Sequence, residues 1–331
     1  MYERIMASGR DIEGLYPHVD VWGFGIPLYL FIGGLAAGIL IFASYFYLKG
    51  KDKQMPATVK ISTLLPPVII VIGLLFLIGD LRHKLYFWRL MTTFQYDSPM
   101  SWGAWILTIE LFAAILWPLT FIDDIIEYFE QHNRKKWVKW MTKTKDLLYK
   151  VPLLVKVVEY LTKKRKAFAY FLFFMSIGLG IYTGILLSSM NARPLWNTPI
   201  LGLLFLTSGV STGAAFIMWI SSDHEEKKLF SKIDLTLIGT EILLIFLMFL
   251  GMSWGPDIMQ RTAEMFFGGQ FTAVFWGVFF IMGLVLPAVL ESMELWGYNV
   301  PVAVPSFLIL MGGLIFRIIM VSAGQISAYT F

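Results

Sequence analysis

Eight long apolar runs constrain the fold of this chain more than any other feature of its sequence. Each run has about 20 residues or more, which lets a helix cross a bilayer core of about 30 Å. They are too long and too continuously apolar for the strands of a membrane barrel. The sequence therefore predicts an all-α integral membrane protein with eight transmembrane helices. The predicted spans are residues 24–48, 62–81, 102–122, 167–188, 199–220, 233–252, 271–291 and 302–322.

The composition agrees with this class and excludes several cofactors. Hydrophobic residues make up 57% of the 331 residues, against about 45–50% in soluble domains. The chain has no cysteine, so it cannot hold an iron–sulfur cluster or a thiolate metal site itself. All four histidines (His18, His83, His132 and His224) lie outside the predicted spans. We therefore expect no haem between facing helices and no metal site, and nothing indicates a nucleic-acid partner.

The lysines and arginines of the loops predict the orientation. One set of loops carries 7 of them and the other set carries 19, of which 12 lie in residues 123–166. Because cytoplasmic loops are enriched in lysine and arginine, we expect the second set to face the cytoplasm. The protein would then lie in the cytoplasmic (inner) membrane, with residues 1–23 and 323–331 on its extracytoplasmic side. No cleavable signal peptide is expected in the first 20 residues.

The spans divide into two predicted bundles of four helices, residues 24–188 and 199–322. A weak repeat supports the division, because the tetrapeptide Met-Ser-Trp-Gly occurs at residues 100–103 and again at 252–255. Each bundle also opens with a G-x-x-x-G pair, which favours close helix packing. These pairs are Gly34 with Gly38 and Gly209 with Gly213.

The first predicted bundle contains two long connections. Residues 123–166 place apolar residues at helical spacing among lysines, which predicts amphipathic helix on an anionic membrane surface. A solvated basic loop and a cytoplasmic partner surface are the alternatives. The other connection, residues 82–101, belongs to the stretch Asp80–Trp105, which is rich in aromatic residues. Its composition suits a segment that binds a planar ring or docks a partner protein.

Polar residues inside predicted spans indicate function because they are costly in lipid. Counting about 1.5 Å per residue puts Tyr29, Asp80, Tyr182 and Arg317 in the outer third of the membrane. A quinone site needs hydrogen-bond donors, a proton-exchanging group and an apolar entry. The tyrosines would supply the donors and Asp80 would exchange protons. His83, at the mouth of a span, would line the pocket.

Each of these residues also has a structural interpretation. The tyrosines can belong to an interfacial aromatic belt, and His83 can be an ordinary surface residue. Asp80 can form an ion pair with Arg82, Lys84 or Arg317, and Arg317 can neutralise Asp80 or Glu110. Glu110 and Glu241 lie deeper, and with Asp234 they form a predicted proton relay toward the inner side.

The chain resembles the NrfD / polysulfide-reductase membrane-subunit family. The resemblance rests on Trp22 followed by residues 29–38 (YLFIGGLAAG), and on Asp80-Leu81 leading to residues 98–105 (SPMSWGAW). It also rests on Tyr182-Thr183-Gly184 and on Arg317 followed by Ala323-Gly324-Gln325. Together these pieces cover the first bundle and the last span.

The resemblance implies a haem-free subunit that reacts with menaquinone or ubiquinone. Its expected partner is an extracytoplasmic ferredoxin-like subunit with four [4Fe–4S] clusters, which exchanges electrons with a catalytic, often molybdopterin, subunit. Tyr29 and Tyr182 would contact the quinone, and Asp80 would exchange protons. The chain departs from the family pattern at Ile26, where an amide donor can occur, and at Tyr29, which is histidine in some relatives.

The expected function is therefore electron exchange between the quinone pool and an outer iron–sulfur subunit, with proton translocation as a further hypothesis. The stretch Asp80–Trp105 would cover the quinone pocket. Two other functions remain open: a secondary transporter with buried carboxylates, and a purely structural membrane anchor. The terminal substrate is not specified by this chain, since that chemistry would lie in other subunits.

Overall fold

The computed structural model describes residues 22–81 and 83–327, and every regular element in this part of the chain is a helix. Eight helical segments are long and apolar enough to cross a membrane, which confirms the predicted fold class. The second and seventh each join an α-helix to a stretch of 3-10 or π-helix. The eight are α1 (Gly25–Leu48), η1–η2–α2 (Ala57–Ile61, Ser62–Leu64 and Leu65–Asp80), α4 (Pro99–Leu119), α8 (Arg165–Ser188), α9 (Ile200–Ile220), α10 (His224–Ser253), η4–α12 (Ala273–Val285 and Leu286–Leu295) and α13 (Ala303–Ile326).

The helices agree with the predicted spans, with one large difference at α10. This helix begins at His224, nine residues before the predicted apolar run. The carboxylate of Asp223 accepts a hydrogen bond from the backbone N–H of Glu226, so it caps the helix in the usual way. A charged first part of the helix therefore precedes the apolar part.

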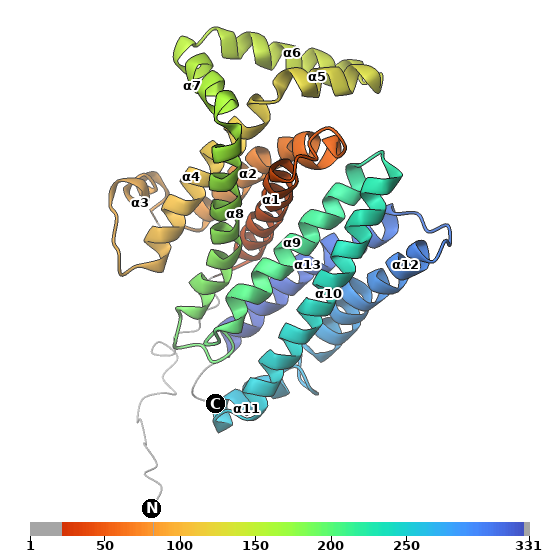
Figure 1. Ribbon diagram of the computed structural model, residues 1–331. Helices are drawn as coiled ribbons and strands as arrows, with labels where there is room; N and C mark the ends of the chain where they lie inside the picture. Colours follow the sequence, from red (N-terminus) through yellow and green to blue (C-terminus); the bar gives the residue numbers. More distant parts are fainter. Residues whose placement is uncertain (1–21, 82, 328–331) are drawn as a thin grey trace, which may run out of the picture.

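The helices form two halves with the same internal arrangement, seen side by side in Figure 1. In the first half α1 packs on α2 and α8, and α4 packs on the same two helices. In the second half α9 packs on α10 and α13, and η4–α12 packs on the same two helices. The halves meet where α1 packs on α9 and α13, and where α8 packs on α9.

Glycines bring α1 and α9 into backbone contact at the centre of the molecule. A β-carbon added at Gly38 would overlap the carbonyl oxygen of Gly209, and one added at Gly213 would lie 2.6 Å from the carbonyl carbon of Gly38. Gly34 meets Gly209 in the same way. The predicted glycine packing is confirmed, and each predicted pair packs against the other.

Two groups of connections mark opposite ends of the spans. The end where α1 begins is named the connector face, because it carries Leu81 and residues 83–98, with η3 (Lys84–Tyr86) and α3 (Arg89–Thr92). It also carries α11 (Asp257–Glu264). At this end the Ser98 side chain accepts from the N–H of Ser101 and caps α4, with Pro99 in the first turn. The Ser-Pro-Met-Ser sequence is thus a helix start.

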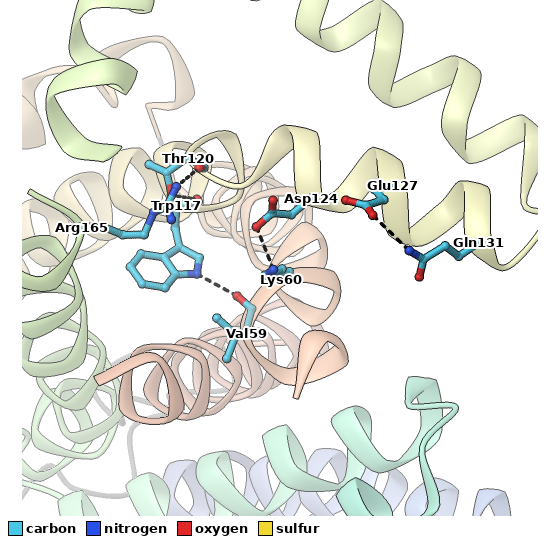
Figure 2. A network of polar contacts seen from close by, with 8 residues as sticks. All are labelled: Val59, Lys60, Trp117, Thr120, Asp124, Glu127, Gln131 and Arg165. Carbon is cyan, nitrogen blue, oxygen red and sulfur yellow. Dashed lines mark hydrogen bonds and ion pairs between the residues drawn. The ribbon is translucent and has the colours of Figure 1, made fainter. Parts of the chain in front are cut away.

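The opposite end is named the insertion face, because residues 122–163 form three further helices there. They are α5 (Ile122–Gln131), α6 (Lys135–Tyr149) and α7 (Pro152–Lys163), which confirms the predicted helical character of the insertion. Figure 2 shows how this region is attached to the spans. Lys60 forms an ion pair of 2.8 Å with Asp124, and Trp117 donates to the carbonyl oxygen of Val59 at 3.0 Å. Arg165 donates to the carbonyl oxygen of Thr120.

Candidate functional site

Two buried tyrosines lie together near the connector face. Tyr29 of α1 is 3% exposed and Tyr182 of α8 is 6% exposed, and the two interact electrostatically. The ring of Tyr29 packs near Gly73 of α2, and the hydroxyl of Tyr182 lies against Gly103 of α4. Within the described residues neither hydroxyl has a hydrogen-bond partner. Two buried donors are therefore free to bind another group.

A cavity of about 550 Å³ lies beneath the connector, between it and the start of α4. Its apolar walls include Leu81, Phe87 and Leu90, and polar groups come from His83, Arg89, Gln95, Ser98 and Ser101. Ser101 holds the connector in place by accepting from the N–H of Gln95 at 3.0 Å. Ser101, which lines the cavity, and Gly103, which contacts the Tyr182 hydroxyl, both lie in the first turns of α4, so the cavity and Tyr182 are near the same end of this helix. The predicted pocket residue His83 lines this cavity, edge-on to Tyr86.

Asp80 is the last residue of α2 and is exposed. It precedes the cavity-lining Leu81. Among the described residues it forms no ion pair with Lys84 or Arg317, and the third expected partner, Arg82, lies outside the described part. The carboxylate is thus open to solvent beside the cavity.

Glu110 is fully buried in the first half, on α4. The Ser176 hydroxyl of α8 donates to its Oε1 at 2.5 Å, and within the described residues its Oε2 has no partner. A buried carboxylate with an unpaired oxygen is costly.

Arg317 of α13 is fully buried where the two halves meet. It donates to the Ser208 hydroxyl at 2.6 Å and to the carbonyl oxygens of Gly313 and Phe205 at 3.0 and 3.2 Å. The absence of a side chain at Gly34 leaves room for the guanidinium. Gly34 is five residues beyond Tyr29, so Arg317 lies about 7 Å deeper than the tyrosine pair.

The position of Arg317 corrects one expectation from the sequence. Among the described residues it forms no ion pair with Asp80 or Glu110. Its acidic neighbour is Glu241 of α10, which interacts with Arg317 and with the Ser208 hydroxyl. The reason is the packing of α13 on α9, which turns Arg317 into the second half.

A row of buried acids continues from Arg317 toward the insertion face, and we name Glu241, Asp234 and Glu291 the acid row. All three side chains are at most 1% exposed. Asp234 interacts electrostatically with Glu241, and Glu291 interacts with Asp234 and with Glu294. Within the described part of the chain, both carboxylate oxygens of Asp234 and of Glu291 lack hydrogen-bond partners.

The row ends near the insertion face, where Ser231 donates to Glu294 at 3.4 Å. Asp234 and Glu241 share one face of α10 because they are seven residues, about two turns, apart. Glu291 stands at the predicted end of its span, so its position in the sequence does not mark it as an intramembrane acid. The helix continues to Leu295, so this acid lies within the membrane-spanning segment. A longer predicted span would have identified it as an intramembrane carboxylate.

Comparison with known proteins agrees with this architecture. Residues 13–328 match the family described as "Polysulphide reductase, NrfD". The chain is 29% identical over 321 residues to Protein NrfD of Escherichia coli, an alignment that covers 93% of this chain and 96% of the relative. It is 31% identical over 281 residues to one chain of the polysulfide reductase of Wolinella succinogenes, covering 82% of this chain and 83% of the relative.

A more distant relative is one subunit of the selenate reductase of Mesobacillus selenatarsenatis. It is 26% identical over 312 residues, covering 87% of this chain and 70% of the relative. The family match extends over nearly the whole chain, through all eight spans and both groups of buried polar residues. This multi-pass membrane protein therefore belongs to the NrfD family of polysulphide reductase proteins.

Proposed function

We propose that this chain is the quinone-reactive membrane subunit of a respiratory reductase complex. It would exchange electrons between the quinone pool, menaquinone or ubiquinone, and an iron–sulfur subunit bound at the connector face. The observation that carries this proposal is the pair of buried tyrosines without hydrogen-bond partners among the described residues, near the end of α4 that also lines the connector cavity. The family membership supports it, since two relatives are named as component chains of reductases.

The residues at the connector face suit a quinone headgroup. When bound, a quinone supplies two-electron redox chemistry coupled to the uptake or release of two protons. Tyr29 and Tyr182 would donate hydrogen bonds, and His83 would offer a further polar group at the cavity. Apolar walls come from the leucines and the phenylalanine that line the cavity, as in most cofactor sites. Asp80, exposed beside the cavity, would exchange protons with solvent.

Electrons would reach the site from partner subunits, because this chain has no cysteine to hold a cluster. The exposed aromatic residues of the connector suit a protein partner. They include Tyr86, Trp88 and Tyr96, and the exposed Trp102 follows them in α4. We propose a ferredoxin-like subunit with [4Fe–4S] clusters at this surface, joined to a catalytic subunit that can carry molybdopterin. The connector face would then be extracytoplasmic.

The acid row would carry protons between the centre of the membrane and the insertion face. Arg317, held by Ser208, would lie beside Glu241 at the central end of the row, and the other two acids would pass protons on toward Glu294. Unpaired carboxylate oxygens can take up a proton or a water molecule without first breaking a hydrogen bond. Glu110, whose Oε2 has no partner in the described part of the chain, would take up and release protons in the first half.

A Tyr29→Phe and Tyr182→Phe double variant tests the quinone site in the purified complex. Loss of two hydrogen bonds should lower turnover with a soluble quinone analogue by roughly tenfold to a hundredfold, while turnover with an artificial dye stays unchanged. Tyr170→Phe is the matched control, because Tyr170 lies on the same helix and is 49% exposed. Unchanged quinone turnover in the double variant would sink the proposal. Solute uptake by quinone-free vesicles would favour a transporter. The absence of both quinone turnover and solute uptake would favour a structural anchor.

A further inference from the structure

A groove of about 1000 Å³ lies on the insertion face, away from the proposed quinone site. Its walls come from the start of the second span, from the α5–α6 hairpin and from the end of α9. It therefore bridges the two halves. Figure 1 shows α5 and α6 running across the ends of the spans, above this region. The floor is apolar and is made by Ile61, Leu64, Leu65, Val68, Phe216 and Ile220.

Three tryptophans stand around the groove. Trp137 and Trp140 of α6 and Trp219 of α9 are 47%, 51% and 49% exposed. Trp137 is held in place by stacking on Phe129, with ring centroids 5.6 Å apart. Half-exposed tryptophans are typical of the level of lipid headgroups. The groove thus opens where an apolar bilayer core gives way to polar headgroups.

The charge at the mouth of the groove is positive. Arg134 and Lys136 line it, and no carboxylate is among its described lining residues. The nearby acids of α5 face elsewhere: Glu127 accepts a hydrogen bond from Gln131, and Glu130 is exposed outside the groove. An anionic group at this mouth would meet two cations and no competing acid from those lining residues.

The turn between α5 and α6 fixes the position of Arg134. The backbone N–H of Arg134 donates to the carbonyl oxygen of Phe129 at 2.9 Å, and that of Asn133 donates to Glu130 at 3.0 Å. Asn133 has a φ of 53°, the left-handed conformation that ends a helix in this pattern. The backbone from which the Arg134 side chain extends is therefore held by the hydrogen bonds of the turn.

We propose that this groove binds one anionic glycerophospholipid of the surrounding membrane leaflet. Its acyl chains would lie along the apolar floor and against the tryptophans, and its phosphate would sit between Arg134 and Lys136. Basic pockets between transmembrane helices are known to bind anionic headgroups. The lipid would fill the groove between the start of the second span, the α5–α6 hairpin and the end of α9. This lipid site is separate from the connector cavity and does not depend on the quinone chemistry.

The test measures which phospholipids the full-length purified protein retains, by native mass spectrometry after exchange into phosphatidylglycerol or phosphatidylcholine. We expect retention of one phosphatidylglycerol and little phosphatidylcholine. Arg134→Gln with Lys136→Gln should weaken phosphatidylglycerol binding by roughly tenfold to thirtyfold, since each cation near a lipid surface contributes about a factor of five. Lys139→Gln with Lys143→Gln removes the same charge from exposed positions of α6 outside the groove, and should bind as the unchanged protein does.

A second variant tests the apolar part without changing any charge. Val68, 52% exposed in the groove, is replaced by tryptophan, which should fill the floor and exclude the lipid. Equal retention of both phospholipids, or equal losses in the groove and control variants, would overturn the proposal. So would displacement of the lipid by inorganic phosphate alone, which indicates a site for free anions, or recovery of a quinone from the groove instead of a phospholipid.

Discussion

The two halves of the molecule share one arrangement of four helices and differ in the polar groups that they bury. In the first half, residues 25–188, Glu110 is the fully buried carboxylate of the described spans. In the described second half, residues 200–326, four carboxylates are buried: the three of the acid row, with Arg317 at its central end, and Glu226, which accepts hydrogen bonds from Thr58 and Ser221. The tyrosine pair and the connector cavity belong to the first half.

Packing alone therefore does not require several buried acids in this fold. The first half builds the same helix contacts around a single carboxylate. Because buried carboxylates are costly in lipid, above all where they are unpaired as Asp234 and Glu291 are among the described residues, the second half keeps the acid row for another reason. We infer a division of labour, in which the first half binds the quinone and exchanges its protons with solvent, and the acid row of the second half carries protons between the centre of the membrane and the insertion face.

The largest effect is expected where the halves touch. Gly38→Leu places a side chain where even a β-carbon would overlap the carbonyl oxygen of Gly209. Overpacking against backbone should cost about 3 kcal/mol or more, and little folded protein should survive size-exclusion chromatography. Gly239→Leu is the control, because nothing lies within 4 Å of a β-carbon there. Normal yield of Gly38→Leu would mean that the halves do not depend on this contact.

The next effect separates the acids of the two halves. Glu241→Gln should lower proton uptake and quinone turnover by about a hundredfold, as expected on loss of a proton-transferring group. Glu110→Gln should cost less, because Glu110 lies outside the acid row. Proton uptake by vesicles that contain the complex, followed with a pH-sensitive dye, measures both. An equal loss of proton uptake in the two variants would contradict the proposed division between the halves. Glu264→Gln, which neutralises an exposed acid, is the control and should leave proton uptake unchanged.

A smaller effect is expected at the exposed acid beside the cavity. Asp80→Asn should lower quinone turnover by about tenfold, less than the hundredfold of a buried group, because solvent water can replace part of its role. Assembly with partner subunits and turnover with an artificial dye should be unchanged. Asp97→Asn, also exposed on the connector, is the matched control. If both variants lose activity equally, the effect belongs to the surface charge and not to Asp80.

The smallest effect concerns the insertion between α4 and α8, which has no counterpart of this kind in the described second half. Asp124→Asn removes the ion pair with Lys60. The Asp124 side chain is 47% exposed and the Lys60 side chain is 11% exposed. A pair of this exposure should contribute less than about 1 kcal/mol, and the loss should shrink in high salt. Thermal unfolding at two salt concentrations measures it. A loss of several kcal/mol would show that the ion pair anchors the insertion.

The sequence predicted the elements well and their mutual positions poorly. The eight spans followed from apolar length, and the glycine contact followed from the spacing of Gly34 and Gly38 and of Gly209 and Gly213. Tyr29 and Tyr182, predicted at one depth, do lie together. The expected partner of Arg317 was wrong, and Glu291 was missed.

These differences have one physical cause. In a soluble helix the polar face marks the outside, so the sequence reveals which side is buried. In lipid both the packed and the exposed faces are apolar, and this signal disappears. The sequence by itself therefore determined the number of membrane-spanning segments and their approximate positions in the chain. Only the tertiary structure decided which way each residue turns, and so brought Arg317 to Glu241 and aligned Asp234 with Glu291, on helices far apart in the chain.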